Sequence, residues 1–286
     1  MNFCISTDSG ADLPVSYCNA HDITVLPLGF TIEGKTYHGA EAMDNKTFYN
    51  MLRNGALPTT SAANPEDTAA LFRQFLAEGK DLLHIAFSSG LSSTCDAARI
   101  AAQMVQEEYP ERSVIVVDSL CASMGQGFLV HQAVKLRDAG ETLADTAKKI
   151  TDMRLNVVHN FTVDDLGHLH RGGRVSKATA VVGTMMGIKP ILHVDDEGHL
   201  TSVGKARGRK ASIKALADRM EQQMKGFDNP EVFISHGDCQ EDAETLAEMV
   251  RSRFGIQDIM IDYIGPVIGT HSGPGTLALY FFGSPR

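Results

Sequence analysis

The chain has 286 residues, and at about 100–200 residues per domain this length favours two domains. Hydrophobic residues make up 43% of the chain and charged residues 21%, which are values of globular proteins and argue against disorder. The net charge of −9 argues against a general nucleic-acid binder, because such a protein needs a basic surface.

The sequence shows no sign of a membrane span, an export signal or a metal site. No apolar run approaches the roughly 18–20 residues that a span needs. The first ten residues, MNFCISTDSG, lack the basic and apolar regions of a signal peptide. Five cysteines occur without a C-x-x-C pair, and no H-E-x-x-H motif is present. We therefore expect a cytoplasmic protein with no disulfide, no metal and no cofactor.

Short apolar strands alternate with amphipathic helices from the start of the chain to about residue 155. The clearest helix start is Asn64, a preferred N-cap residue, followed by Pro65 at the first helical position. This alternation predicts an open parallel sheet with helices on both faces. The predicted strands are 3–7, 82–87 and 114–118, and the predicted helices cover about 65–76, 93–105, 124–137 and 142–153.

The pattern changes after about residue 155. Two strand-like runs flank the turn sequence DDEG, which predicts an antiparallel pair, and the later strands and helices complete a mixed sheet. We place a domain boundary here, so that the predicted domains are residues 1–155 and 156–286. The predicted strands are 157–163, 189–194, 199–206, 231–236, 258–265 and 276–283, and the predicted helices are 212–224 and 241–253.

Three segments contain more small and polar residues than packing requires. They are 58–61 (PTTS), 88–94 (SSGLSST) and 269–275 (GTHSGPG), each expected just after a strand or just before a helix. Ligands of open parallel sheets bind outside the carboxyl ends of the strands, where helix N-termini favour anions. Hydroxyls of Thr60 and Ser92 could add donors to the same anion. Because no lysine is present, the segments do not match a phosphate loop, and a carboxylate fits better.

Each of these features also has a purely structural explanation. Serine and threonine before a helix often only cap it. His271 could donate to a carboxylate, or it could be an ordinary surface or core histidine. Two clusters of basic residues are either solvated faces or surfaces that dock a partner protein or a lipid head group. The clusters contain Arg171, Arg174 and Lys177, and Lys205, Arg207, Arg209, Lys210 and Lys214.

Eight short motifs, taken in order, resemble the DegV family over nearly the whole chain. They are TDSGADL (7–13), PTTSAANP (58–65), SSGLSST (88–94), VDSLCASMGQG (117–127), LHRGGRVS (169–176), GIKPIL (187–192), KARGRK (205–210) and IGPVIGTHSGPGTLAL (264–279). Each motif alone is weak, but eight in register are highly specific. The resemblance implies an α/β fold of two domains with the ligand between them. The N-terminal domain is then a three-layer α/β/α unit with a parallel sheet, and the C-terminal domain a two-layer α/β unit with a mixed sheet.

The resemblance also implies a function. DegV proteins bind a long-chain fatty acid, for example of the palmitate class, in a tunnel between the domains. In some bacteria they present it to a fatty acid kinase, which forms acyl-phosphate for phospholipid synthesis. We therefore expect a non-catalytic carrier with a bound fatty acid as ligand, a fatty acid kinase as partner and transient contact with a membrane surface.

Individual residues carry over from the family motifs. The second threonine of PTTS matches Thr60, and the first serine after the leucine of SSGLS matches Ser92; in the family both hydrogen-bond the fatty-acid carboxyl. The histidine of GTH-x-GPG matches His271, which joins that polar network. Family members often have glycine where this chain has Ser93, which could add a further donor.

Other residues are assigned less specifically. An arginine near the head group or the partner surface matches either Arg207 or Arg209, and Arg171 and Arg174 could make the same kind of contact. Methionines are adaptable enough to line a tunnel, although ordinary core filling is the better account of any single one. The candidates are Met124, Met185, Met186 and Met260.

Two other functions remain open from the residues alone. One is an enzyme of the same architecture, such as a phosphotransferase acting on a small hydroxylated substrate. It would need a nucleophile or metal cluster facing the crevice, for which only His271 and Asp8 are candidates. The other is a surface-interaction or regulatory protein that docks through the two basic clusters. That function is compatible with a carrier, which must hand over its cargo.

Overall fold

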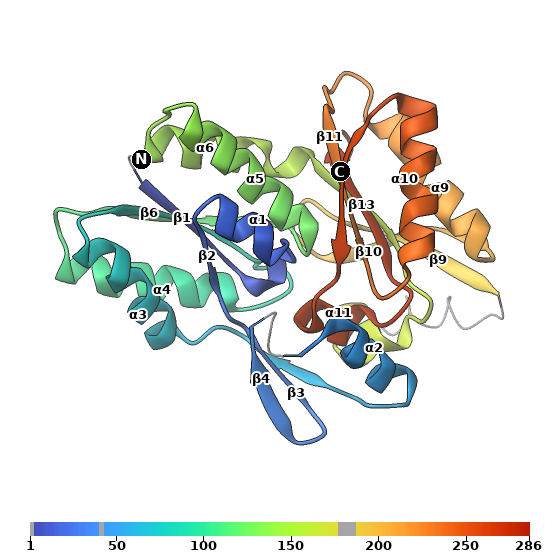
Figure 1. Cartoon of the computed structure of the whole chain (residues 1–286), viewed down its shortest axis with the longest axis horizontal. Helices are drawn as coiled ribbons and strands as arrows, with labels where there is room; N and C mark the ends of the chain where they lie inside the picture. Colours follow the sequence, from blue (N-terminus) through green and yellow to red (C-terminus); the bar gives the residue numbers. More distant parts are fainter. Residues whose placement is uncertain (1–2, 40–42, 177–186) are drawn as a thin grey trace.

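The structure, a computed structural model, describes residues 3–39, 43–176 and 187–286. Two large parts lie side by side, one built around a parallel sheet and the other around a mixed sheet (Figure 1). The two parts correspond to the two α/β units expected from the sequence.

The first part is a parallel sheet between two layers of helices, as predicted. Its strands lie in the order β2, β1, β6, β7, and all neighbours are parallel. Helices α3 and α4 pack on one face, and α5 and α6 pack on the other. The elements are β1 (Phe3–Asp8), α1 (Val15–Ala20), β2 (Ile23–Leu26), α3 (Pro65–Ala77), β6 (Asp81–Ala86), α4 (Thr94–Glu108), β7 (Val114–Asp118), α5 (Met124–Asp138) and α6 (Leu143–Met153).

Side-chain caps start two of these helices at the predicted residues. The Asn64 side chain accepts hydrogen bonds from the backbone N–H groups of Glu66 (2.8 Å) and Asp67 (3.4 Å), and Pro65 occupies the first turn. The Thr142 hydroxyl accepts from the N–H of Asp145 at 3.1 Å in the same way. Such caps pair N–H groups that a helix start leaves free.

The second part is a mixed six-stranded sheet. Its order is β10, β9, β8, β13, β11, β12, and only β11 and β12 are parallel. Helices α9 and α10 cover one face, and α5 of the first part packs on the other. The elements are β8 (Val157–Thr162), α7 (Gly167–Arg171), β9 (Ile188–Val194), β10 (Leu200–Arg207), α9 (Arg209–Gln223), β11 (Glu231–His236), α10 (Gln240–Phe254), β12 (Asp258–Tyr263), α11 (Pro266–Ser272) and β13 (Leu277–Phe282).

Helix α5 joins the two parts through one continuous core. Its Phe128 ring packs edge-on against Phe233 of β11, with ring centroids 5.0 Å apart. The same core contains Phe3 of the parallel sheet and Tyr280 of the mixed sheet. Shared packing of this kind holds the two sheets in a fixed relation, which is what a site between them requires.

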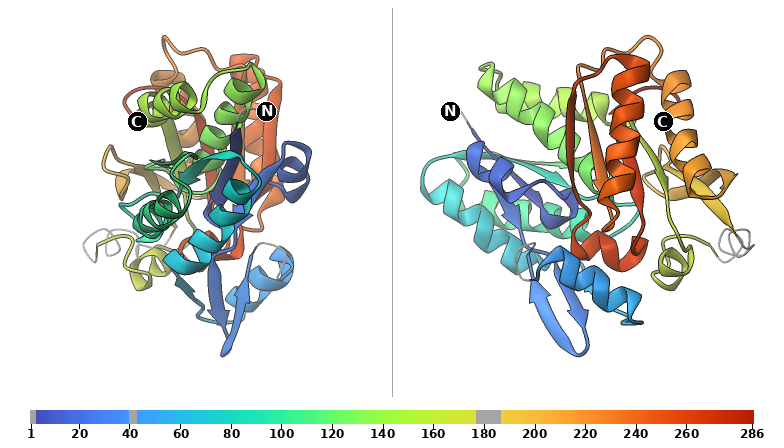
Figure 2. Two further views of the ribbon diagram at one scale, coloured as in Figure 1. Left: turned by 90° about the vertical axis from the view of Figure 1, so that its left-hand side faces the viewer. Right: turned by 45° about the vertical axis from the view of Figure 1, so that its right-hand side comes forward.

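Elements α1, β2 and α11 were not predicted from the sequence, and neither was one whole unit of the fold. Residues 28–39 and 43–61, here called the insert, form a small three-stranded sheet and a helix. Its hydrophobic centre includes Phe30 and Phe48. The insert lies beside α11 of the second part (Figure 2), and the Tyr49 hydroxyl donates to the carbonyl of Ile264 at 2.7 Å. The elements are β3 (Gly29–Ile32), β4 (Lys35–His38), α2 (Asn45–Arg53) and β5 (Thr59–Ser61).

Three local predictions were wrong. Residues 59–61 form strand β5 and not a loop, because they pair with β3. The segment 269–275 is not a loop after a strand: Gly269–Ser272 belongs to α11, which starts at Pro266, and the loop that follows leads into β13. Helix α9 begins at Arg209 and not at 212, because Gly208, with φ 82°, ends β10 directly before it.

Candidate ligand-binding site

A cavity of about 170 Å³ lies between the two parts. Its walls come from β5 of the insert, the loop after β6, the residues just before α5, helices α7 and α11, and strands β8, β9, β10 and β13. Most of the lining is apolar. The apolar lining residues are Leu28, Ala62, Phe87, Leu91, Ala122, Phe161, Leu169, Val194, Leu200, Ile264, Val267, Ile268 and Ala278.

A polar cluster lies where the insert meets α11, at what we call the near end of the cavity. Thr60 of β5 and His271 of α11 are joined by a hydrogen bond of 2.8 Å between Oγ1 and Nε2. Burial, with a smaller effect from the positive charge of Arg174, lowers the pKa of His271 to about 4. The imidazole is therefore neutral at pH 7. Its other nitrogen, Nδ1, is buried without a partner among the described residues.

Ser92 and Ser93 reach the near end from the start of α4. The Ser92 hydroxyl lies 2.9 Å from Oγ1 of Thr94 and accepts from the Thr94 N–H at 3.2 Å. Thr94 in turn accepts from the N–H of Ala63, just after β5, at 3.2 Å. This chain of contacts brings the Ser92 loop and the Thr60 strand to one place. All four predicted carboxylate-binding residues, Thr60, Ser92, Ser93 and His271, line the cavity.

Among the described residues that line this cavity, Arg174 is the only arginine or lysine. Its Nε donates to the carbonyl of Leu91 at 3.2 Å, and its Nη1 donates to the carbonyl of Gly172 at 2.5 Å. Burial lowers the pKa of the guanidinium, but arginine remains charged in proteins. The near end therefore combines hydroxyls, a neutral imidazole and one fixed positive charge.

A second cavity of about 380 Å³ lies on the outer side of this cluster. Thr60, His271 and Arg174 line both cavities, so they form the boundary between them. Arg171 and His168 line only the outer one. A molecule outside can thus approach the polar end of whatever occupies the inner cavity.

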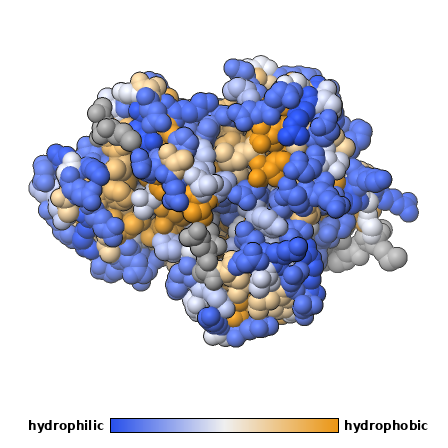
Figure 3. All heavy atoms as spheres, viewed as in Figure 1, coloured by the Kyte–Doolittle hydropathy of each residue, from blue (hydrophilic) through white to orange (hydrophobic). Residues whose placement is uncertain are grey.

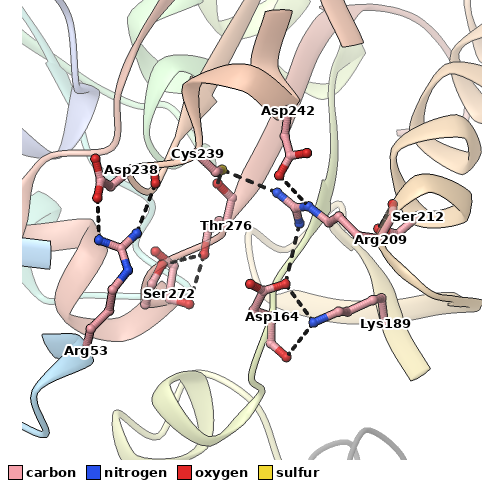
Figure 4. A network of polar contacts seen from close by, with 11 residues as sticks. Arg53, Asp164, Lys189, Arg209, Ser212, Asp238, Cys239, Asp242, Ser272 and Thr276 are labelled. Carbon is pink, nitrogen blue, oxygen red and sulfur yellow. Dashed lines mark hydrogen bonds and ion pairs between the residues drawn. The ribbon is translucent and has the colours of Figure 1, made fainter. Parts of the chain in front are cut away.

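Arg207 and Arg209 are not brought to this cluster. Arg209 donates to the carboxylate of Asp242 at 2.8 Å and lies 3.8 Å from that of Asp164, which also binds Lys189 at 2.7 Å (Figure 4). Arg207 is exposed at the end of β10. Neither residue lines the inner or the outer cavity.

For the two candidate methionines that the structure describes, core filling is correct and tunnel lining is not. Met124 is fully buried in the shared core, and Met260 packs against that core; neither lines the cavity. Met185 and Met186 lie outside the described residues. Branched aliphatic and aromatic side chains, such as Leu200, line the cavity instead of methionines.

Asp8 and His271, the candidates for an enzyme, do not face a common space. The Asp8 carboxylate accepts from the N–H groups of Phe87 (2.8 Å) and Gly10 (3.0 Å) and from the Gln126 amide (3.1 Å). Burial raises the pKa of Asp8 to about 6. These contacts hold the loops at the carboxyl end of the parallel sheet, and Asp8 does not line the inner cavity.

Sequence reasoning missed three polar residues at the other end of the cavity, Ser123, His159 and Tyr280. The sequence did contain a pattern that could have identified His159 as an inward-facing residue. In the strand 157–163 every second residue is expected on the same face, which places His159 with Phe161 toward the core. No such pattern identified the others.

The described residues, 3–39, 43–176 and 187–286, contain no group of three or more His, Cys, Asp or Glu side chains placed to hold a metal ion. Within the same ranges no helix is long and apolar enough to cross a membrane. The face seen in Figure 3 is mostly hydrophilic, with apolar residues gathered near its middle.

Comparison with known proteins gives a consistent result. The sequence model of the DegV family, described as "Uncharacterised protein, DegV family", matches residues 2–284. A DegV domain-containing protein of Clostridium perfringens is 41% identical over 286 residues, which cover 99% of this chain and 98% of that protein. One from Lactococcus lactis is 42% identical over 282 residues, covering 98% and 97%.

Solved structures agree with the family match. A fatty-acid-binding DegV family protein from Thermus thermophilus is 30% identical, with a TM-score of 0.89 and coverage of 99% of this chain and 100% of that one. DegV of Bacillus subtilis, described as a fatty acid binding protein, is 32% identical, with a TM-score of 0.86 and coverage of 99% and 100%. The match extends over both sheets and the insert. This chain belongs to the DegV family.

Proposed function

We propose that this protein is a non-catalytic carrier that binds a long-chain fatty acid, of the palmitate class, in the cavity between the two parts. One observation carries the proposal: an apolar cavity ends in a cluster of hydroxyls, a neutral imidazole and an arginine. A single acid group on a long apolar chain matches this arrangement. The fatty-acid binding described for the Thermus and Bacillus relatives supports it.

The two parts of the ligand contribute differently to binding. Burying the chain yields about 0.8 kcal/mol per CH₂, so the apolar part supplies most of the affinity. The carboxylate must only avoid being left unpaired, which would cost about 1–3 kcal/mol or more. We assign its donors to Thr60, Ser92 and His271, with Ser93 as a further donor and Arg174 as the balancing charge.

The outer cavity supports the second half of the proposal, presentation to a fatty acid kinase. Since the boundary between the cavities is formed by Thr60, His271 and Arg174, a bound carboxylate would face the outer cavity. We assign partner contact to Arg171 and to the exposed Arg207. Arg209, held by Asp242 and Asp164, would instead fix the start of α9.

Several broader features complete the proposal. The carrier would act in the cytoplasm and touch a membrane surface transiently, where fatty acids are available. The two domains would be residues 1–155 and 156–286, with the fatty acid at their junction. No cofactor other than the bound fatty acid would take part.

Native mass spectrometry of the purified protein tests the binding. We expect one fatty acid per chain, and we expect Thr60→Ala combined with Ser92→Ala to lose it. The matched control is Thr36→Ala combined with Ser89→Ala, which removes one hydroxyl from the insert and one from the Ser92 loop at exposed positions outside the cavity. Full occupancy in the first double variant would contradict the assigned roles.

A separate assay tests presentation. Arg171→Glu is expected to slow acyl-phosphate formation by a cognate kinase while fatty acid binding stays unchanged, because Arg171 lines only the outer cavity. Lys148→Glu, at an exposed position on α6, controls for the change of net charge. Equal rates for both variants would remove Arg171 from the partner surface.

A further inference from the structure

The cavity follows strand β13 away from the near end. Thr276 lies just before this strand, and Ala278 and Tyr280 face the cavity along it. Across the sheet, Ala278 pairs with Phe161 and Tyr280 with His159. A strand rises about 3.3 Å per residue, so Tyr280 lies roughly 13 Å beyond Thr276. We call the place where His159 and Tyr280 meet the far end.

His159 is held rigidly at the far end. Its Nε2 accepts from the N–H of Ala122 at 3.3 Å, and its Nδ1 donates to the carbonyl of Val157 at 3.0 Å. The ring packs edge-on against Tyr280, with centroids 5.2 Å apart. On its other side Gly125 leaves no space for a side chain. Both ring nitrogens are therefore occupied, and burial keeps the pKa of His159 far below its usual value.

Tyr280 is fixed by a chain of hydroxyl groups. Its hydroxyl lies 2.9 Å from Ser235, which lies 3.0 Å from Ser123. Ser123 donates to the Asp12 carboxyl at 2.5 Å, and the N–H of Gly265 donates to the same carboxyl at 3.0 Å. Burial raises the pKa of Asp12 to about 8. The positive charge of Arg286, whose guanidinium donates to the carbonyl of Leu120, adds to burial in lowering the pKa of His159.

The space behind this wall is filled. Phe282, the next residue of β13 on the same face, packs against Phe128 with ring centroids 4.9 Å apart. Phe128 and Val157 are fully buried in the shared core. The cavity therefore ends at His159 and Tyr280, and moving either ring would break hydrogen bonds and disturb a packed core.

We propose that His159 and Tyr280 form a rigid stop that sets the greatest length of acyl chain this protein accepts. The inference rests on the proposed function. Because the polar groups of His159 and Tyr280 already have hydrogen-bond partners within the protein, a terminal methyl group can contact this wall without leaving any of them unpaired. An extended chain advances roughly 1.2 Å per bond, so the section along β13 accepts about ten or eleven bonds. Longer acids would have to displace the stop.

The test uses protein stripped of lipid and then exposed to an equimolar mixture of saturated fatty acids of increasing length. Mass spectrometry of the bound acids gives the length profile. Tyr280→Val removes the ring, and the profile is expected to shift toward acids longer by about two to four carbons. Ala122→Val fills the far end, and a shift toward acids shorter by about one or two carbons is expected. Phe281→Val is the matched control, because Phe281 is next in the strand but faces the opposite core.

The outcomes separate this inference from the proposed function. If Tyr280→Val and Ala122→Val fold and keep the profile of the unaltered protein, the stop is wrong and fatty acid binding stands. If the unaltered protein takes up no acid at all, the proposed function fails, and the stop with it. Should circular dichroism show that Tyr280→Val is unfolded, the profile of Ala122→Val decides alone.

Discussion

The two ends of the cavity each contain a histidine, half-buried at the near end and buried at the far end, and the two differ in how completely they are paired. At the near end His271 bonds to Thr60 through Nε2, while Nδ1 has no partner among the described residues. At the far end His159 uses both ring nitrogens. Burial lowers the pKa of both, so charge does not distinguish them.

The serine hydroxyls at the two ends of the cavity differ in their pairing in the same way as the two histidines. Ser272, beside His271, lines the cavity with a hydroxyl that has no partner in the described parts of the chain. Ser123 at the far end both donates to Asp12 and bonds to Ser235. Polar groups with unused capacity can receive a ligand, whereas groups that saturate one another form a wall. Residue type alone therefore does not identify a binding group; its remaining hydrogen-bonding capacity does.

The largest expected effect comes from removing the positive charge of Arg174, which lines the near end of the cavity. Arg174→Gln should raise the Kd for palmitate roughly 10–100-fold, since hydrogen bonds to charged groups contribute about 1.5–3 kcal/mol. Displacement of a fluorescent fatty acid measures this change. Arg207→Gln, at an exposed position outside both cavities, is the control and should leave the Kd unchanged. Similar losses in both variants would show that net charge, not position, matters.

A smaller effect should appear in histidine titrations followed by NMR. A nearby carboxylate favours the protonated imidazole, so loading with palmitate should raise the pKa of His271 from about 4. The pKa of His159 should not change, because the acyl chain that reaches it is uncharged. His271→Gln assigns the resonance. If the pKa of His159 rises more than that of His271, the carboxylate of the ligand lies at the far end and the assigned orientation is wrong.

The smallest effect is expected from Tyr280→Phe, which keeps the ring of the stop and removes one hydroxyl. The free energy of unfolding should fall by about 1 kcal/mol, because Ser235 loses a partner. The length profile of bound acids should stay as in the unaltered protein. Urea denaturation and mass spectrometry measure the two quantities. A changed profile would show that the hydroxyl, and not the ring, limits the chain.

Local signals were sufficient for most of the regular structure. Helix α3 starts at Asn64 and Pro65 as predicted, because capping depends only on residues within one turn. The run 231–236 is strand β11, since a continuous apolar segment between polar turns has few alternatives. The insert was missed because its strands have only three or four residues, too few for a periodic pattern to be recognised.

The sequence offered Thr60, Ser92 and His271 as candidate donors to a carboxylate, and the resemblance of the motifs assigned them to one site. Thr60 and His271 are 211 positions apart, and no local pattern brings them together. Their contact depends on the insert folding against α11, which Tyr49 secures through the carbonyl of Ile264. Arg207 and Arg209 were equivalent candidates in the sequence. In the structure Arg207 lies at the end of strand β10, whereas Arg209, which follows the turn at Gly208, forms an ion pair with Asp242.

The sequence by itself determined most strands and helices outside the insert, the caps at Asn64 and Thr142, and the family, because these depend on neighbouring residues and on motifs kept in register. Only the tertiary structure decided which polar side chains retain hydrogen-bonding capacity toward the cavity and which use it up on one another. That decision rests on partners distant in the chain, such as Asp12 and Ser123, or Ser235 and Tyr280. Long-range packing creates these pairs, and no property of a single residue specifies them.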